Sequence, residues 1–163
     1  MRNFTTRLAL VALVVASASG CDHTGGAASA TSTTATTATT VTVAMRAVAG
    51  VGPVLTGPDG RTLYLFVPDA GTQVRCLGNC PQHWPPLMLP GHAKLAAGAG
   101  VAAALLGTTR GAEPDTRQVT YAGWPLYGYV GDVEPNQANG QRVFLDGGDW
   151  FAMGPDGHPA LAS

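Results

Sequence analysis

The clearest pattern of hydrophobic positions is the run Leu-Tyr-Leu-Phe-Val at residues 63–67. Aromatic and β-branched residues of this kind are typical of β-strands. Successive side chains of a strand point to opposite faces, so Leu63, Leu65 and Val67 share one face, and Tyr64 and Phe66 share the other. Because both faces are apolar, the pattern predicts a strand that is covered on both sides.

A turn precedes this strand. Residues 57–60 read Gly-Pro-Asp-Gly, in which proline presets φ and glycine accepts positive φ. The run Val54–Thr56 before the turn is short and apolar. We therefore expect residues 54–56 and 63–67 to form a β-hairpin.

The pattern returns later in the chain. Residues 63–69 align without gaps to residues 126–132, and five of the seven positions agree in type. Residues 151–157 likewise repeat the strand-then-turn character of residues 54–60. A single hairpin is at best marginally stable in water, so two copies of one unit are expected to bury their aromatic strands together.

The segment between the copies, residues 94–106, has Leu, Ala and Val at spacings that predict one short helix, although Gly98 and Gly100 weaken it. The chain contains 22 Gly and 12 Pro, which favour turns and short strands. The predicted fold is mostly β, with two related hairpin units packed as one domain and a short helix between them.

The N-terminus has the pattern of a secretory signal peptide over residues 1–20: Arg2 and Arg7, an apolar run, then small residues. Residues 18–21, Ala-Ser-Gly-Cys, resemble a bacterial lipobox, in which the cysteine is acylated and becomes the mature N-terminus. Leucine is usual where Ala18 stands. The resemblance implies lipidation of Cys21 and anchoring at the outer face of the bacterial cell membrane; a plain secreted protein with an unmodified Cys21 is the alternative.

Residues 21–47 are expected to form the lipidated N-terminus and a flexible tether, because they are dominated by Thr, Ala, Ser and Gly with little charge. The folded domain is then predicted to span residues 48–163. Without residues 1–20 the chain carries seven basic and ten acidic side chains, and no basic stripe appears. This composition argues against nucleic acid as a partner.

The cysteine count also bears on the compartment. Three cysteines are an odd number for an exported chain, and lipidation of Cys21 would leave Cys76 and Cys80 as a pair. Three intervening residues, Gly78 among them, allow a turn that brings the two sulfurs together. We favour a structural disulfide; a redox-active or metal-binding pair of thiols is the alternative.

The alternative has a chemical basis, because sulfur and imidazole ligands suit copper. Cys76, Cys80 and His83 are the candidate ligands, with Met88 and His92 nearby in sequence. The run Cys-x-x-x-Cys-Pro also resembles copper-delivery proteins of the Sco type, whose thioredoxin-like βαβ alternation is not visible here.

Two acidic residues, Asp69 and Asp132, end equivalent strands. They could act as paired carboxylates for a cation, or each could accept backbone N–H bonds in a turn, which we favour. We expect Tyr64 and Tyr127 to be buried or half-buried, with their hydroxyls bonded to polar groups.

These features together resemble a family of bacterial secreted-repeat lipoproteins with a Y-x-[FWY]-x-x-D motif. The motif residues are Tyr64, Phe66, Asp69, Tyr127, Tyr129 and Asp132. The Cys-x-x-x-Cys pair, residues 84–87 and residues 150–157 fit the same family. Bulkier residues are usual at Gly128 and Gly131, which predicts a looser second strand. The resemblance implies a bacterial envelope protein and supplies no chemistry.

Catalytic signatures are missing from the sequence. There is no G-x-S-x-G, H-E-x-x-H, P-loop or G-x-G-x-x-G motif, and Ser163 is the only serine after residue 32. We therefore expect a non-catalytic binding or interaction module without a cofactor, whose partner is a ligand or another envelope protein. A copper-binding or thiol-redox envelope protein remains the alternative.

Overall fold

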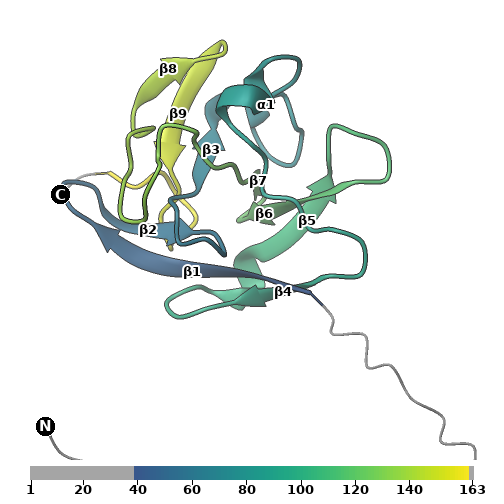
Figure 1. Cartoon of the computed structure of the whole chain (residues 1–163), viewed down its shortest axis with the longest axis horizontal. Helices are drawn as coiled ribbons and strands as arrows, with labels where there is room; N and C mark the ends of the chain where they lie inside the picture. Colours follow the sequence, from purple (N-terminus) through teal and green to yellow (C-terminus); the bar gives the residue numbers. More distant parts are fainter. Residues whose placement is uncertain (1–38, 162–163) are drawn as a thin grey trace, which may run out of the picture. The chain divides into compact units, whose positions relative to one another are not determined.

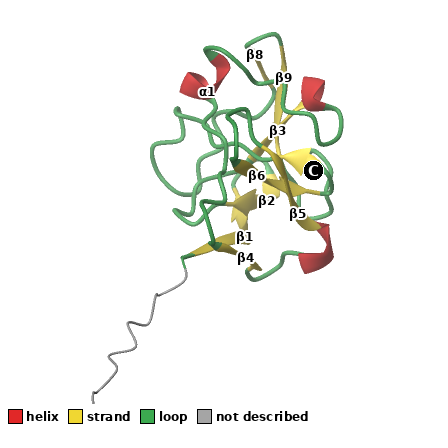
Figure 2. Cartoon of the chain, turned by 90° about the vertical axis from the view of Figure 1, so that its right-hand side faces the viewer, coloured by secondary structure: helices red, strands yellow, loops and turns green. Residues whose placement is uncertain are grey.

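The computed structural model describes residues 39–161. The predicted signal peptide, Cys21 and most of the predicted tether lie outside these residues. Within residues 39–161, no helix is both long and apolar enough to cross a membrane. Strands and loops make up most of the domain (Figure 2), so the mostly β prediction is confirmed.

The described residues contain nine strands, one α-helix and two 3-10 helices. The strands are β1 (Thr40–Val48), β2 (Gly52–Thr56), β3 (Tyr64–Phe66), β4 (Lys94–Ala97), β5 (Leu106–Arg110), β6 (Arg117–Tyr121), β7 (Trp124–Pro125), β8 (Val143–Leu145) and β9 (Gly148–Ala152). The helices are η1 (Val67–Asp69), α1 (Cys80–His83) and η2 (Ala103–Leu105).

The strands form three small sheets with the orders β2-β1-β4, β3-β9-β8 and β5-β6-β7 (Figure 1). All neighbouring strands are antiparallel except β1 and β4, which are parallel. Strand β1 begins at Thr40, so the domain begins earlier than the predicted boundary at residue 48. Val41 and Val43 alternate with threonine and are buried, which is the period-2 pattern of a half-buried strand.

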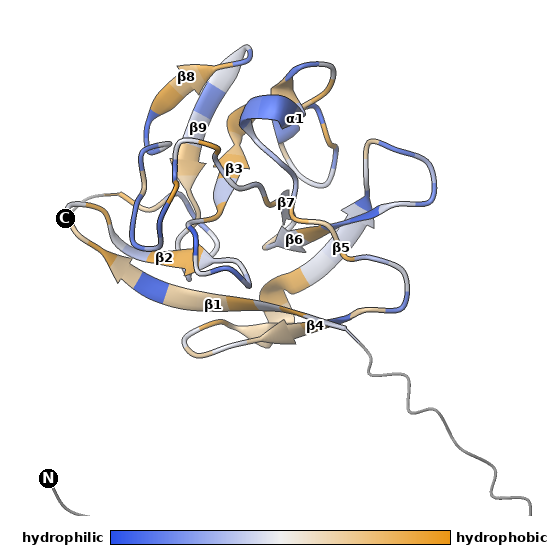
Figure 3. Cartoon of the chain, viewed as in Figure 1, coloured by the Kyte–Doolittle hydropathy of each residue, from blue (hydrophilic) through white to orange (hydrophobic). Residues whose placement is uncertain are grey.

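The helix predicted at residues 94–106 is wrong. Lys94–Ala97 is strand β4, which pairs with β1 from Thr40 to Val43, and only Ala103–Leu105 forms a 3-10 turn. Gly100 has a left-handed backbone conformation with a φ of +75°, which ends any helical run. The α-helix of the described residues lies instead at Cys80–His83, and Figure 3 shows it as hydrophilic.

Strand β3 is covered on both sides, as its pattern predicted. Tyr64 and Phe66 belong to one cluster of buried residues, and Leu63 and Leu65 belong to the other. Val67, the last residue of the predicted strand, is instead 42% exposed at the start of η1.

The predicted hairpin is only partly correct. The turn at residues 57–60 is closed by the Gly60 N–H, which donates to the Gly57 carbonyl at 2.9 Å, and the Leu63 N–H donates to the Leu55 carbonyl at 2.8 Å. However, the main ladder of β2 is with β1, and that of β3 is with β9. The partner of β2 is the segment just before it, which the sequence had assigned largely to the tether. The partner of β3 lies far along the chain, where the local pattern does not specify it.

Two units of the domain have matching hydrogen bonds. We call residues 54–87 the N-terminal unit and residues 118–153 the C-terminal unit. The bond from Leu63 N to Leu55 O is matched by one from Leu126 N to Val119 O, at 3.0 Å. Between the units, Tyr64 and Tyr127 exchange both backbone bonds, at 2.8 and 3.0 Å.

Each unit also gives its final segment to the other. In the C-terminal unit, β9 pairs with β3 of the N-terminal unit, with Ala152 opposite Tyr64. In return, Pro86 forms a bridge to Tyr127, and Gly128 N donates to the Pro85 carbonyl at 2.8 Å. The units are therefore interlocked by reciprocal pairing.

The turn after β9 matches the turn after β2, as the sequence suggested. In residues 154–157 the Gly157 N–H donates to the Gly154 carbonyl at 3.1 Å, and Gly60 and Gly157 have φ of +79° and +84°. The strand before this turn is different: residues 151–153 are the counterpart of residues 85–87, because both pair with the opposite unit.

Candidate functional site

The tyrosine and aspartate of the repeated motif bond across the two units. The Tyr64 hydroxyl donates to Asp132 Oδ2 at 2.5 Å, and the Tyr127 hydroxyl donates to Asp69 Oδ2 at 2.7 Å. All four side chains are at most 1% exposed. Each unit therefore supplies the buried hydrogen-bond partner that the other requires, and this exchange ties the units together.

The second oxygen of each carboxylate holds a loop. Asp69 Oδ1 accepts the backbone N–H of Arg75 at 2.7 Å, and Asp132 Oδ1 accepts that of Asn139 at 2.8 Å. Both carboxylates thus bind backbone donors, as we favoured from the sequence. Among residues 39–161, no group of three His, Cys, Asp or Glu side chains is placed to hold a metal ion.

Burial sets the protonation of this network. Burial raises the pKa of Asp69, although the Tyr127 hydroxyl and backbone N–H groups act in the opposite direction. Burial also raises the pKa of Tyr64 and of Tyr127, and the adjacent carboxylates add to it. Both phenols therefore remain protonated donors at any physiological pH.

Four aromatic rings stack in one row beside these pairs, in the order Phe66, Trp150, Trp84 and Tyr129. Successive centroids lie 4.2, 3.9 and 4.3 Å apart, and the two indoles are nearly parallel. The row is symmetric, because each unit supplies one outer ring and one indole. Phe66 and Trp84 come from the N-terminal unit, and Tyr129 and Trp150 come from the C-terminal unit. Trp150 Nε1 donates to the Leu145 carbonyl at 3.0 Å, whereas Trp84 Nε1 is buried without a partner within residues 39–161.

Cys76 and Cys80 form a disulfide with a Cα–Cα distance of 5.2 Å. The cysteines are 1% and 4% exposed, and they belong to the cluster that contains the aromatic row. His83, the third candidate copper ligand, is exposed, and its Nδ1 lies 3.0 Å from Asp146 Oδ2. Because both sulfurs are bonded and buried, this oxidised state offers no thiolate for copper.

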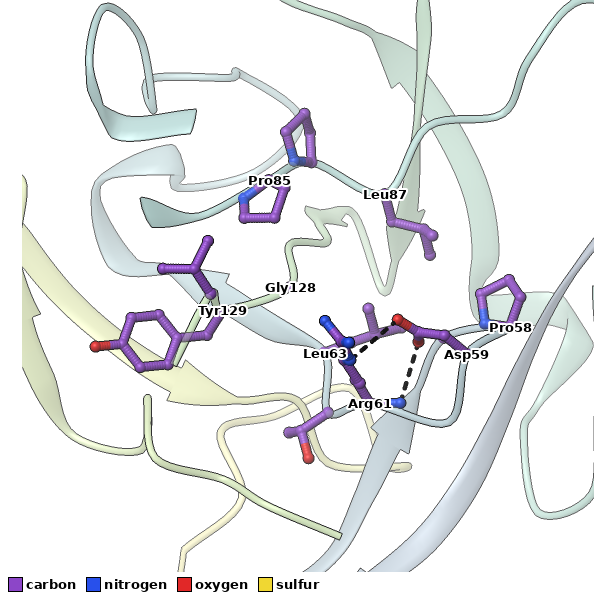
Figure 4. A pocket seen from close by; sticks show the side chains of 12 residues that line it. Pro58, Asp59, Arg61, Leu63, Pro85, Leu87, Gly128 and Tyr129 are labelled. Carbon is purple, nitrogen blue, oxygen red and sulfur yellow. Dashed lines mark hydrogen bonds and ion pairs between the residues drawn. The ribbon is translucent and has the colours of Figure 1, made fainter. Parts of the chain in front are cut away.

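A groove lies at the surface between the two units (Figure 4). Its volume is about 380 Å³, within the usual range of about 300–1,000 Å³ for small-molecule sites. Three segments line it: residues 57–63 of the N-terminal turn, residues 85–87, and residues 128–130 of the opposite unit. Most of this lining is apolar, with Pro85, Leu87 and Tyr129 in view in Figure 4.

The groove has one charged edge. Arg61 Nε lies 3.6 Å from Asp59 Oδ2, and Asp59 Oδ1 accepts the Arg61 backbone N–H at 3.1 Å. The side chains are 47% and 61% exposed, so this ion pair contributes at most about 1 kcal/mol to stability. It is therefore available to other partners at little cost.

Comparison of the two units shows why the groove is open. Equivalent strand pairings align the two units residue by residue. The bridge between residues 56 and 62 matches that between residues 120 and 125, so Arg61 occupies the position of Trp124. The pairing of residues 64 and 152 matches that of residues 127 and 86, so Gly128 occupies the position of Leu65 and Pro85 that of Phe151.

We call the equivalent region, formed by Leu65, Trp124 and Phe151, the counterpart surface. There Leu65 is buried, and Trp124 and Phe151 pack against its cluster. At the groove, a Cβ on Gly128 would meet only Pro85 atoms, at 3.8 and 3.9 Å. The groove is thus the place where an apolar filling present in one half of the molecule is missing from the other.

The family model that matches this chain is described as a secreted repeat of unknown function, and it matches twice, at residues 45–88 and 112–153. The chain belongs to this family. The two matches contain the whole of the two units defined above. No curated protein and no solved structure matches the chain.

The structure brings together most of the residues that the sequence singled out. The motif residues form the two tyrosine–aspartate pairs and supply the two end rings of the aromatic row, Phe66 and Tyr129. The disulfide belongs to the same buried cluster. Sequence reasoning did not find the groove. The sequence did show that Gly128 is unusually small for the family, from which we predicted a looser strand. Only the residues that pair with Gly128 in the structure show that its missing side chain opens a cavity.

Proposed function

We propose that this protein is a lipid-anchored, non-catalytic binding module at the outer face of a bacterial cell membrane. The matched family is one of secreted repeats and is named for lipoproteins. The lipobox-like sequence at residues 18–21 supports an anchor on Cys21. Several acyl chains on one cysteine would hold the domain firmly at the bilayer, whereas one chain binds marginally.

The groove between the units is the observation that carries the binding function. Exposed concave sites of this size, mostly apolar with a few polar groups, are the usual form of small-ligand sites. The side chains that fill the counterpart surface are replaced here by Arg61, Gly128 and Pro85. A bound molecule would restore the contact that these replacements remove.

The state of the buried ionisable groups supports a non-catalytic role. Asp69 and Asp132 each accept a tyrosine hydroxyl and a backbone N–H. Carboxylates held in this way serve the packing of the two units and face no open cavity. The charged groups of the groove, Asp59 and Arg61, are largely solvated.

Two experiments test the two parts of this proposal. Membrane anchoring is tested by detergent phase partition of wild-type protein and Cys21→Ser expressed in a bacterium; we expect the wild type in the detergent phase and the variant in the aqueous phase. An aqueous wild type would refute the anchor.

Binding is tested by NMR titration of the purified protein with indole, an uncharged apolar probe. We expect saturable shifts at Gly128, Tyr129 and Val130, and their loss in Gly128→Leu. The variant is sterically compatible at the backbone, because a Cβ at residue 128 would be in ordinary van der Waals contact with Pro85, at 3.8 and 3.9 Å. Equal titration of both proteins would refute the groove as the binding site.

A further inference from the structure

We propose that the groove binds a free α-amino acid with a large apolar side chain. This inference rests on the proposed binding function and names the ligand class. The argument has two independent parts, one from the charged edge of the groove and one from its apolar floor.

The charged edge presents both signs of charge on one short turn. Arg61 can offer further N–H donors to a carboxylate, and Asp59 can accept from an ammonium group. Arg61 Nε and Asp59 Oδ2 lie 3.6 Å apart. A free amino acid carries a carboxylate and an ammonium group on one carbon atom, so its head group matches this edge in sign and spacing. A simple anion would be repelled by the Asp59 carboxylate, and a simple cation would be repelled by the Arg61 guanidinium.

The backbone of this turn is not specialised. The turn at residues 154–157 has the same bonds, and Asp156 Oδ1 accepts the N–H of His158 at 3.1 Å, as Asp59 does for Arg61. The aspartate is thus part of the turn chemistry in both places. What distinguishes the groove turn is the guanidinium of Arg61, which faces the cavity (Figure 4).

The apolar floor indicates the side chain of the ligand. On the counterpart surface the same backbone frame is filled by Leu65, Trp124 and Phe151, one branched and two aromatic side chains. The groove has Pro85 and Leu87 on one side and Tyr129 on the other (Figure 4). A leucine, phenylalanine or tryptophan side chain would therefore occupy the space that residues of the same kind occupy in the other half.

The test is calorimetric titration of the purified full chain with L-phenylalanine, L-leucine and L-tryptophan, with glycine and N-acetyl-L-phenylalanine as comparison ligands. We expect saturable binding of at least one large apolar amino acid and none of glycine. N-acetylation removes the ammonium group and should weaken binding about tenfold or more, as should Arg61→Gln, because each loses a charge-assisted hydrogen bond.

The matched variants are Asp59→Asn and Asp156→Asn, which change equivalent aspartates of two turns with the same backbone bonds. We expect Asp59→Asn to weaken binding and Asp156→Asn to leave it unchanged. Gly128→Leu should abolish binding while the protein keeps its unfolding midpoint within a few degrees.

The outcomes separate the two levels of the argument. If indole binds the wild type but not Gly128→Leu, and no amino acid binds better than its N-acetyl derivative, the ligand class is wrong and the groove remains a binding site. If neither indole nor any amino acid distinguishes the wild type from Gly128→Leu, both the ligand class and the proposed binding function are overturned.

Discussion

The bond between Tyr127 and Asp69 joins the two units, and its removal should be costly. Tyr127→Phe deletes one hydroxyl that donates to Asp69 Oδ2 at 2.7 Å. The ring remains, so its edge-to-face contact with Trp150, with centroids 5.2 Å apart, is preserved and little cavity forms. Because the carboxylate is fully buried, it would lose a donor that water cannot replace.

The expected magnitude follows from these contacts. Hydrogen bonds to charged groups contribute about 1.5–3 kcal/mol, so we expect Tyr127→Phe to lower the free energy of unfolding by about 2 kcal/mol. For a domain of this size that corresponds to a fall in Tm of roughly 5–10 °C. Chemical denaturation at neutral pH measures the loss directly, and Tyr129→Phe, which removes the hydroxyl of a half-buried ring in the same aromatic row, is the control.

A double-mutant cycle with Asp69→Asn separates the bond from general packing effects. If the tyrosine and the carboxylate interact as described, the double variant should lose less stability than the sum of the two single variants. Additive losses, or a Tyr127→Phe protein within about 0.5 kcal/mol of the wild type, would refute the role of this bond.

Three further predictions concern the disulfide, the buried carboxyl and the close approach of one glycine. Replacing Cys76 and Cys80 together by alanine opens a very short loop and should lower the free energy of unfolding by about 2 kcal/mol, measured by denaturation against wild type with and without reductant. The pKa of Asp69 is raised in the folded state, so protonation of this carboxyl stabilises the fold below its unfolded pKa, and that stability is lost as pH rises through the folded pKa. The wild type should therefore lose stability relative to Asp69→Asn between acid and neutral pH. A difference in unfolding free energy that changes in the opposite direction would contradict the raised pKa. Gly140→Ala places a Cβ 2.7–2.9 Å from the rings of Trp84 and Tyr64 and should cost about 1–3 kcal/mol. Gly128→Ala, whose Cβ would make only ordinary van der Waals contact with Pro85, should be nearly neutral when both variants are compared by thermal unfolding.

The sequence predicted the features that depend on local chemistry. Alternation at residues 63–66 gave the two faces of β3 correctly, because side-chain direction in a strand is fixed by the backbone alone. The turn at residues 57–60 was predictable from its proline and glycines. The short spacing between Cys76 and Cys80 was enough to indicate a disulfide.

Pairings between distant segments were not predictable in this way. Residues 94–97 read as helix because alanine favours helices, yet they form a strand beside β1 because tertiary pairing outweighs a weak local preference. The exchange of residues 85–87 and 150–152 between units leaves no local signal, since prolines at 85 and 86 argue against a strand. The groove depends on this exchange and was therefore hidden as well.

The difference between the two units is the strongest guide to function in this molecule. Both units need the tyrosine, the aspartate and the tryptophan, because each of these residues completes a contact made by the other unit. Structural requirements of this kind act on both halves alike, so they do not explain why Arg61, Gly128 and Pro85 differ from their counterparts. These three positions come from separate segments and from both units, yet they line one groove. Differences that converge on one surface while the supporting frame stays matched are what the binding site that we propose requires: a rigid scaffold, an open cavity and a small number of polar groups at its edge.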